Sequence, residues 1–199
     1  MSVLDMYPQT RADRRRAQTH ELLKQAAADV LAEVGYQNLT IKAITERADV
    51  GYGTFYLHFP DKDEIVWAVI YDIAEELRQR VDALVADVPF PRREFLSWIE
   101  IFRFVESNKQ GFADFFGSGG SSKLLQRYQD YVAAVHERNL RAGVYSSGLD
   151  LPPDFLAQFI TGALVRLLLW WAQTPNGHTP ETMARMVYEA VYRQPAPQL

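Results

Sequence analysis

The sequence has no cysteine among its 199 residues, and this absence removes several classes of site at once. No disulfide, thiolate metal site or cysteine nucleophile can form. The four histidines, at positions 20, 58, 136 and 178, are scattered without the spacing of metal ligands. No serine lies in a nucleophile-elbow pattern, and "GSGGSSK" at 117–123 has Ser122 where a phosphate loop needs glycine. The sequence therefore predicts no enzyme, no metal and no cofactor.

An excess of positive charge is also missing. The chain has 21 lysines and arginines against 25 acidic residues, which gives a formal net charge of −4 and a pI of about 5.6. A general polyanion-binding protein is basic. Binding to nucleic acid would therefore have to come from a local arrangement of residues.

Targeting and membrane-spanning segments are not evident. The N-terminal "MSVLDMYPQTRADRRR" lacks the apolar region of a secretory signal. The longest apolar run, "FLAQFITGALVRLLLWWA" at 155–172, carries Gln158 and Arg166 and follows Pro152 and Pro153. These polar and helix-starting residues favour a buried helix over a membrane span. We therefore expect a cytoplasmic protein without a membrane partner.

Apolar residues recur with helical spacing along almost the whole chain, and strand patterns are weak. Gly35 lies where a helix C-cap is expected, Thr40 is a predicted N-cap, and Asp61 with Glu64 forms a predicted capping box. The pattern predicts an all-α fold of about nine helices. The helices form a three-helix N-terminal domain at 1–62 and a helical bundle at 63–199. Apart from the segment at 52–59, the predicted helices are 14–34, 41–48, 61–86, 91–107, 108–116, 121–143, 153–173 and 180–193. The predicted loops are 117–122 and 145–153.

The ring-rich stretch "YGTFYLHF" at 52–59 fits a strand and a short helix equally well by period. Its context decides, because a capped helix and a three-residue turn precede it and no partner strand is available. The arrangement of helix, short turn and second helix is that of a helix-turn-helix.

In a helix-turn-helix the second helix enters the major groove of DNA by its N-terminal end. Glycines there permit a close backbone approach, Thr54 suits a base edge or a thymine methyl, and tyrosine and histidine suit the sugar-phosphate backbone. The helices that begin near Thr40 and Lys62 carry a lysine in the first turn, which suits a phosphate. The predicted DNA-contacting residues are Thr40, Lys42, Gly51, Tyr52, Gly53, Thr54, Tyr56, His58 and Lys62.

The net charge of this N-terminal segment does not favour DNA. Residues 1–64 contain eight basic and ten acidic side chains, for a net charge of −2. The basic run "RADRRR" at 11–16 has two interpretations: an arm that reaches the DNA backbone or minor groove, or a solvated N-terminus.

The segment "LTIKAITERADVGYGTFYLHFPDKDEI" at 39–65 resembles the N-terminal signature of TetR-family transcriptional repressors. The similarity covers about 14–65 closely and the helical remainder loosely. It implies a homodimer, double-stranded DNA operators, and a C-terminal domain whose small-molecule ligand releases the DNA. Tyr52 departs from the small polar or basic residue that is common at its position, which affects the expected base preference.

Together with this resemblance, the rings of the later helices indicate a ligand pocket between 91–107, 121–143 and 153–173. A flat apolar or aromatic ligand suits such a lining. One of Arg103, Glu106, His136 and Arg166 is expected to hold a polar end of the ligand. The predicted ligand-binding residues are Trp67, Tyr71, Trp98, Phe102, Phe116, Tyr128, Tyr131, Phe159 and Arg166.

The last two helices carry more apolar surface than one small bundle needs, and Gly162 with Ala163 permits close helix approach. They predict a two-fold four-helix interface, although both stripes packing within one chain is the alternative. The predicted interface residues are Leu164, Leu168, Trp171, Met183, Val187 and Val191.

The sequence thus predicts a ligand-responsive transcriptional regulator that binds a near-palindromic operator as a homodimer, most simply a repressor. The alternative is a ligand-binding or adaptor protein with the same fold that does not bind an operator. The acidic N-terminal segment favours that alternative.

Overall fold

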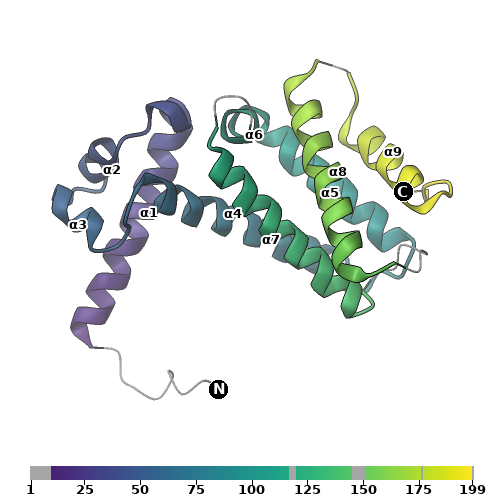
Figure 1. Ribbon diagram of the computed structural model, residues 1–199, viewed down its shortest axis with the longest axis horizontal. Helices are drawn as coiled ribbons and strands as arrows, with labels where there is room; N and C mark the ends of the chain where they lie inside the picture. The colour runs from purple at the N-terminus through teal and green to yellow at the C-terminus, as the bar shows by residue number, and fades with distance from the viewer. Residues whose placement is uncertain (1–9, 117–119, 145–150, 176, 199) are drawn as a thin grey trace. The chain divides into compact units, whose positions relative to one another are not determined.

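The computed structural model describes residues 10–116, 120–144, 151–175 and 177–198, and over these ranges the chain forms nine helices and no strand (Figure 1). The predicted all-α fold is confirmed. Parts of the predicted loops, 117–119 and 145–150, lie outside the described residues. The helices are α1 (Arg11–Asn38), α2 (Ile41–Arg47), α3 (Tyr52–Tyr56), α4 (Lys62–Leu84), α5 (Arg92–Ser107), α6 (Lys109–Phe116), α7 (Ser122–Arg141), α8 (Pro153–Gln173) and α9 (Pro180–Tyr192).

The ends of the N-terminal helices follow from single residues. Thr10 and Asp13 form a reciprocal capping box, so α1 begins at Arg11, three residues before the predicted start. Gly35 interrupts the helical backbone with φ of 73°, a left-handed conformation that glycine adopts without strain. The Thr40 hydroxyl accepts a hydrogen bond from the Ala43 amide at 3.1 Å, and Asp61 accepts one from the Glu64 amide at 2.9 Å.

The chain divides into two compact units, residues 1–71 and 72–199, and α4 contributes to both. The predicted domain boundary, at 62/63, lies at the start of this same helix. In the first unit α1 buries a stripe of small and branched side chains, α1 packs on α2, and α2 packs on α3. Its core consists of Leu23, Ala26, Ala27, Val30, Leu31, Leu39, Ile44, Phe55, Phe59, Ile65, Val66, Val69 and Ile70.

In the second unit α7 packs on α8, and α5 packs on both α8 and α9. Edge-to-face ring pairs lie at two of these contacts: Phe95 on Tyr188 with centroids 5.8 Å apart, and Phe102 on Trp171 at 5.3 Å. The Trp171 indole N–H donates to the His178 carbonyl at 3.1 Å, which ties the end of α8 to the segment before α9.

The predicted dimer residues need correction. Leu164, Leu168, Trp171, Met183 and Val187 are buried inside the chain's own bundle, and Val191 is half-buried. The apolar stripes of α8 and α9 therefore cover α5 and α7 of the same chain, the alternative that the sequence left open. Both faces of α8 are apolar, so helical period alone does not show which of them packs inside the chain.

The other face of α8 remains uncovered in the single chain. Phe155 and Phe159 are 57% and 66% exposed, their rings stack with centroids 6.4 Å apart, and Gly162 and Ala163 follow one turn later. Arg166 and Trp170 continue this face. By length and composition α8 could cross a membrane, and 44% of its apolar window is buried in the bundle.

Candidate DNA-contacting surface and internal cavity

The segment from α2 to α3 forms a helix-turn-helix. Ile44 on α2 and Phe55 on α3 are fully buried, and α2 packs on both α1 and α3. Between them, Asp49 has φ of 51°, a left-handed conformation that aspartate tolerates better than most residues, and the Val50 amide donates to the Thr45 carbonyl at 3.0 Å. The turn thus leads directly from the end of α2 into α3.

The outer surface of α3 is uncharged and carries two tyrosines. Tyr52 and Tyr56 are 55% and 49% exposed, and their hydroxyl oxygens lie 3.2 Å apart. A Cβ atom added at Gly53 would meet no atom within 4 Å, and one added at Gly51 would meet only the Thr54 hydroxyl oxygen, at 3.6 Å. The fold itself therefore does not require glycine at either position.

The other predicted DNA contacts differ in how they are engaged. Thr40 and Lys42 are exposed at the start of α2, and Thr54 is partly exposed on α3. The Lys62 ammonium instead donates to the Tyr36 carbonyl at 3.2 Å and lies 4.3 Å from the centre of the Tyr36 ring. Lys62 thus holds the start of α4 against the end of α1, a contact that the sequence pattern did not indicate.

His58 is also drawn into the fold. Its ring lies 5.8 Å from that of His20, which stacks on Phe59 at 4.4 Å. Burial, and next the charges of His20 and Arg16, lower the pKa of His58. The side chain is therefore neutral at pH 7 and can offer a hydrogen bond but not a charge.

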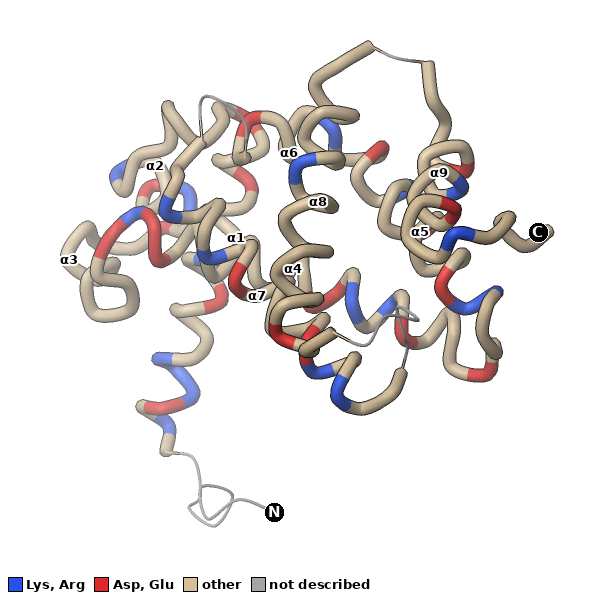
Figure 2. Tube along the Cα trace, turned by 45° about the vertical axis from the view of Figure 1, so that its right-hand side comes forward, with Lys and Arg blue, Asp and Glu red and all other residues tan. Residues whose placement is uncertain are grey.

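The basic run at 11–16 is helical. Its arginines lie on the first turns of α1 and are exposed, and Figure 2 shows blue segments at the end of α1 that follows the N-terminus. The Arg16 guanidinium donates to the Leu57 carbonyl at 3.4 Å. Of the two interpretations of this run, the described residues fit a charged helix start rather than an extended arm.

The second unit contains a cavity of about 210 Å³ with mostly apolar walls. It is lined by α4, α5, α7, α8 and α9, which include the three helices predicted to enclose a pocket. Among the described residues, no cluster of three or more potential metal ligands occurs. The lining residues are Ala74, Leu77, Arg78, Val81, Asp82, Val85, Arg93, Glu94, Ser97, Trp98, Ile101, Tyr128, Tyr131, Val132, Val135, His136, Asn139, Val144, Ile160, Leu164, Val165, Leu168, Val191 and Tyr192.

Three of the nine predicted ligand-binding residues line this cavity: Trp98, Tyr128 and Tyr131. The other six do not line it. Phe102 and Phe116 are buried in ring contacts with Trp171 and Tyr128, so they fill the core. Phe159 and Arg166 lie on the exposed face of α8, and Trp67 and Tyr71 belong to the first unit.

Of the four residues expected to hold a polar end, only His136 lines the cavity. Arg103 and Glu106 are exposed on α5, and Arg103 pairs with Glu181 at 2.8 Å. Sequence reasoning missed Arg78, Asp82 and Glu94, because helical period places a charged residue near the core without showing that it faces a cavity.

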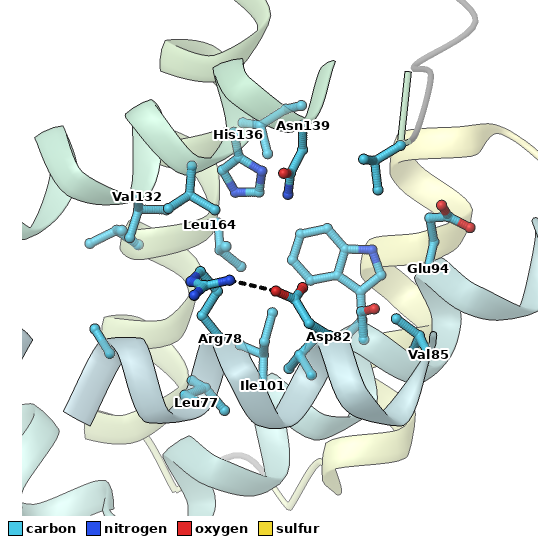
Figure 3. A pocket seen from close by; sticks show the side chains of 18 of the residues that line it. Leu77, Arg78, Asp82, Val85, Glu94, Ile101, Val132, His136, Asn139 and Leu164 are labelled. Atoms are coloured by element: carbon cyan, nitrogen blue, oxygen red, sulfur yellow. Dashed lines mark hydrogen bonds and ion pairs between the residues drawn. The ribbon is translucent and has the colours of Figure 1, made fainter. Parts of the chain in front are cut away.

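One charged group in the cavity wall is satisfied by its neighbours (Figure 3). The Arg78 guanidinium donates to Glu75 at 2.9 Å and to Asp82 at 2.5 Å, and the Tyr131 hydroxyl donates to Glu75 at 2.6 Å. The Arg78 guanidinium, and next the Tyr131 hydroxyl, lower the pKa of Glu75. This network joins α4 to α7 and keeps Glu75 ionised.

The titrating groups on the other walls are shifted by burial. Burial lowers the pKa of His136 to about 4 and raises that of Tyr128 to about 12, so both are neutral at pH 7. Burial also raises the pKa of Glu94, against smaller lowerings by its own backbone N–H and then by the charge of Arg93. In Figure 3, His136 and Asn139 lie together, and Glu94 lies on the side away from Val132 and Arg78.

Acid is expected to destabilise the protein through His136. Its pKa is about 6.5 when unfolded and about 4 when folded, so protons favour the unfolded state between these values. Protonation of His136 leaves the free energy of unfolding almost unchanged above pH 6.5. It lowers this free energy by about 2 kcal/mol at pH 5 and by at most about 3 kcal/mol at still lower pH. Denaturant unfolding at pH 7 and pH 5 measures this loss.

His136→Asn is the matched variant for that measurement, because Glu94 acts in the opposite direction: protonation of a carboxyl whose pKa is raised favours the folded state. The difference between wild type and variant isolates the histidine. An unchanged pH slope in His136→Asn would contradict the assignment.

Comparisons with known proteins identify both parts of the chain. Residues 23–69 match the family described as "Bacterial regulatory proteins, tetR family". Residues 96–193 match the family described as "Transcriptional regulator C-terminal region".

Individual relatives agree with these matches. The HTH-type transcriptional regulator Mb2936c of Mycobacterium bovis is 30% identical over 130 residues, which are 62% of this chain and 67% of the relative. YhgD of Bacillus subtilis, of the same type, is 20% identical over 84% of this chain and 91% of its own length. The crystal structure of RolR with resorcinol has a TM-score of 0.66 at 23% identity, and covers 93% of this chain and 91% of RolR.

Proposed function

The chain belongs to the TetR family of transcriptional regulators, and from this membership we propose that it represses transcription by binding a near-palindromic operator as a homodimer. A small molecule in the cavity of residues 72–199 releases the DNA. Such a protein acts in the cytoplasm and is not an enzyme. The proposal extends to the DNA-contacting residues named from the sequence, with Lys62 and His58 in supporting positions.

The observation that carries the DNA-binding proposal is the surface of α3. Gly51 and Gly53 are exposed and have no packing reason to be glycine, so their small size is explained by a backbone that approaches another molecule closely. Thr54 lies between exposed Tyr52 and Tyr56. A short helix with these side chains fits the major groove, where hydroxyl groups reach base edges and phosphates.

The homodimer is supported by the uncovered face of α8. Phe155, Phe159 and Trp170 are exposed there, and the small residues Gly162 and Ala163 lie between them along α8. Large exposed apolar patches usually mark interaction surfaces, and small residues let two helices approach closely. We propose that this face, rather than the buried residues predicted from the sequence, meets a second copy of the chain.

Ligand control is supported by the continuity of α4. Its first half carries Lys62 and the buried Ile65 and Val66 of the DNA-binding unit, and its second half lines the cavity with Ala74 and Leu77. A ligand that binds one position of this helix better than another shifts both units together. RolR, whose structure contains resorcinol, supports a small effector by analogy.

A protein that binds ligands without an operator is the second candidate, because residues 1–64 carry a net charge of −2. The two candidates differ in a direct experiment. Thr54→Ala is expected to reduce discrimination at one base position by about 1–3 kcal/mol, since we propose that Thr54 contacts a base edge. Lys42→Ala is expected to weaken binding to all DNA sequences alike. It should also reduce, by about one, the steepness with which log affinity falls with log salt concentration.

Equilibrium binding to a set of single-base operator variants at two salt concentrations measures both effects. Asp130→Asn, at an exposed residue of α7 in the second unit, is the control for a change of surface charge. It leaves the order of preference among operators unchanged. If Thr54→Ala and Lys42→Ala change neither preference nor affinity, the α3 assignment fails.

A further inference from the structure

The cavity holds a carboxylate that the fold leaves without a partner. Glu94 is only 5% exposed, and neither of its carboxylate oxygens has a hydrogen-bond partner. Among the described residues it is the one buried acidic side chain in this state. Burying an ionised carboxylate without a partner costs several kcal/mol, so this arrangement needs an explanation.

The usual structural use of a glutamate at this position is not available. Glu94 is the third residue of α5, where a glutamate commonly accepts a hydrogen bond from the backbone N–H of the N-cap residue. The N-cap here is Pro91, which has no N–H group. The favourable helix dipole and the residue's own backbone N–H remain, but no other residue donates a hydrogen bond to the carboxylate.

Nearby cations do not neutralise Glu94 by direct contact. The Arg93 guanidinium donates to the Val85 carbonyl at 3.2 Å and to the Ala86 carbonyl at 3.3 Å, at the end of α4. Arg78 is engaged with Glu75 and Asp82. The two arginines of the cavity wall are therefore committed elsewhere, and His136 is neutral at pH 7 because burial lowers its pKa to about 4.

The surroundings of Glu94 suit a cation with an apolar body. Trp98 follows Glu94 by one helical turn, so both side chains project from the same face of α5 into the cavity, and Tyr192 lines it from α9. Aromatic faces attract ammonium groups, and most of the remaining wall is aliphatic. The cavity, at about 210 Å³, limits the ligand to a compact molecule.

We infer that the cavity takes a small lipophilic amine in its protonated form, with the ammonium group against the Glu94 carboxylate and the apolar body between α4, α7 and α8. The inference rests on the proposed function in that it names the effector of the same cavity. It narrows the aromatic or apolar ligand expected from the sequence to one that carries a positive charge.

A matched set of probes tests the inference: 1-naphthylmethylamine, 1-naphthylmethanol and 1-naphthoate, which share a ring system and present a cation, a neutral hydroxyl and an anion. Calorimetric titration of the full-length protein without DNA gives the three affinities. The amine is expected to bind about tenfold or more tightly than the alcohol, as one desolvated charge pair requires. The anion is expected to bind weakest.

Glu94→Gln keeps the shape of the side chain and removes its charge. It is expected to lose the preference for the amine by about tenfold or more and to leave the alcohol unaffected. Glu106→Gln, an exposed acid on the same helix, makes the same change in net charge and should keep the preference. Circular dichroism confirms that both variants fold.

The inference is overturned if the alcohol or the anion binds as tightly as the amine, if Glu94→Gln retains the preference, or if no probe binds. None of these outcomes involves DNA, so each leaves operator binding to be judged by its own experiment. Failure of operator binding would conversely leave the amine site standing.

Discussion

Replacement of Phe159 by glutamate is expected to convert the protein from a dimer into a monomer and to reduce operator affinity by about a hundredfold or more. Phe159 is 66% exposed at the centre of the uncovered α8 face, so a charge there would be buried without a partner in a two-fold interface. A monomer reads one half-site of a few base pairs, and each lost base pair costs about 1–3 kcal/mol.

Sedimentation at micromolar concentration and operator titration measure the two effects. Gln126→Glu, an exposed residue of α7, makes the same charge change off this face and should remain dimeric. Leu168→Glu is a poor substitute, because Leu168 lies in the core and its variant would unfold rather than dissociate. A Phe159→Glu protein that stays dimeric would show that the interface lies elsewhere.

Phe102→Ala is expected to lower the free energy of unfolding by about 3–5 kcal/mol. Phe102 is fully buried and packs edge to face on Trp171, with centroids 5.3 Å apart, so its removal leaves a hole in the core. This result would separate Phe102 from the ligand cavity to which the sequence assigned it. Denaturant unfolding of the second unit, followed by tryptophan fluorescence, measures the loss.

Phe90→Ala is the control for that experiment, because Phe90 is exposed and contacts only one ring edge to face, that of Tyr192, among the described ring pairs. Phe90→Ala should lower the free energy of unfolding by no more than about 1 kcal/mol. If Phe102→Ala costs no more than the control, Phe102 does not have the core role that its burial indicates.

Helical spacing and capping residues were enough to predict the fold. The Thr40 cap comes from local chemistry, which is written in the sequence, and it is found in the structure. Gly35, predicted as a C-cap, is instead a break within α1, which ends at Asn38. The start of α1 was predicted less well, because its capping box uses Thr10 and Asp13, which precede the apolar pattern. The spacing of apolar residues does not predict a helix end that is set by polar groups outside the apolar pattern.

The faces of the later helices could not be predicted in the same way. On α8 the buried Leu164 and Leu168 and the exposed Phe155 and Phe159 are all apolar, so period alone cannot tell which side meets the chain's own core. Glu94 illustrates the opposite limit, because an acid in a first helical turn is ordinary in sequence. Only its burial and the N-cap proline show that it lacks a partner.

Lys62 shows a third limit, which concerns long-range contacts. Its position in a first helical turn indicated an incoming phosphate, but its ammonium bonds the carbonyl of Tyr36, 26 residues earlier in the chain. Contacts of this range depend on how α1 and α4 meet within the first unit, which a motif does not specify.

We propose that this chain reads DNA sequence through α3 as a two-fold dimer. The most direct test is selection of bound duplexes by the purified full-length protein from a random pool at low salt, followed by sequencing. The account predicts an enriched, near-palindromic sequence whose half-sites are separated by about one helical turn, about 10 base pairs, and whose enrichment declines with Phe159→Glu. Recovery of no enriched sequence, with binding no stronger than to bulk DNA, would contradict it.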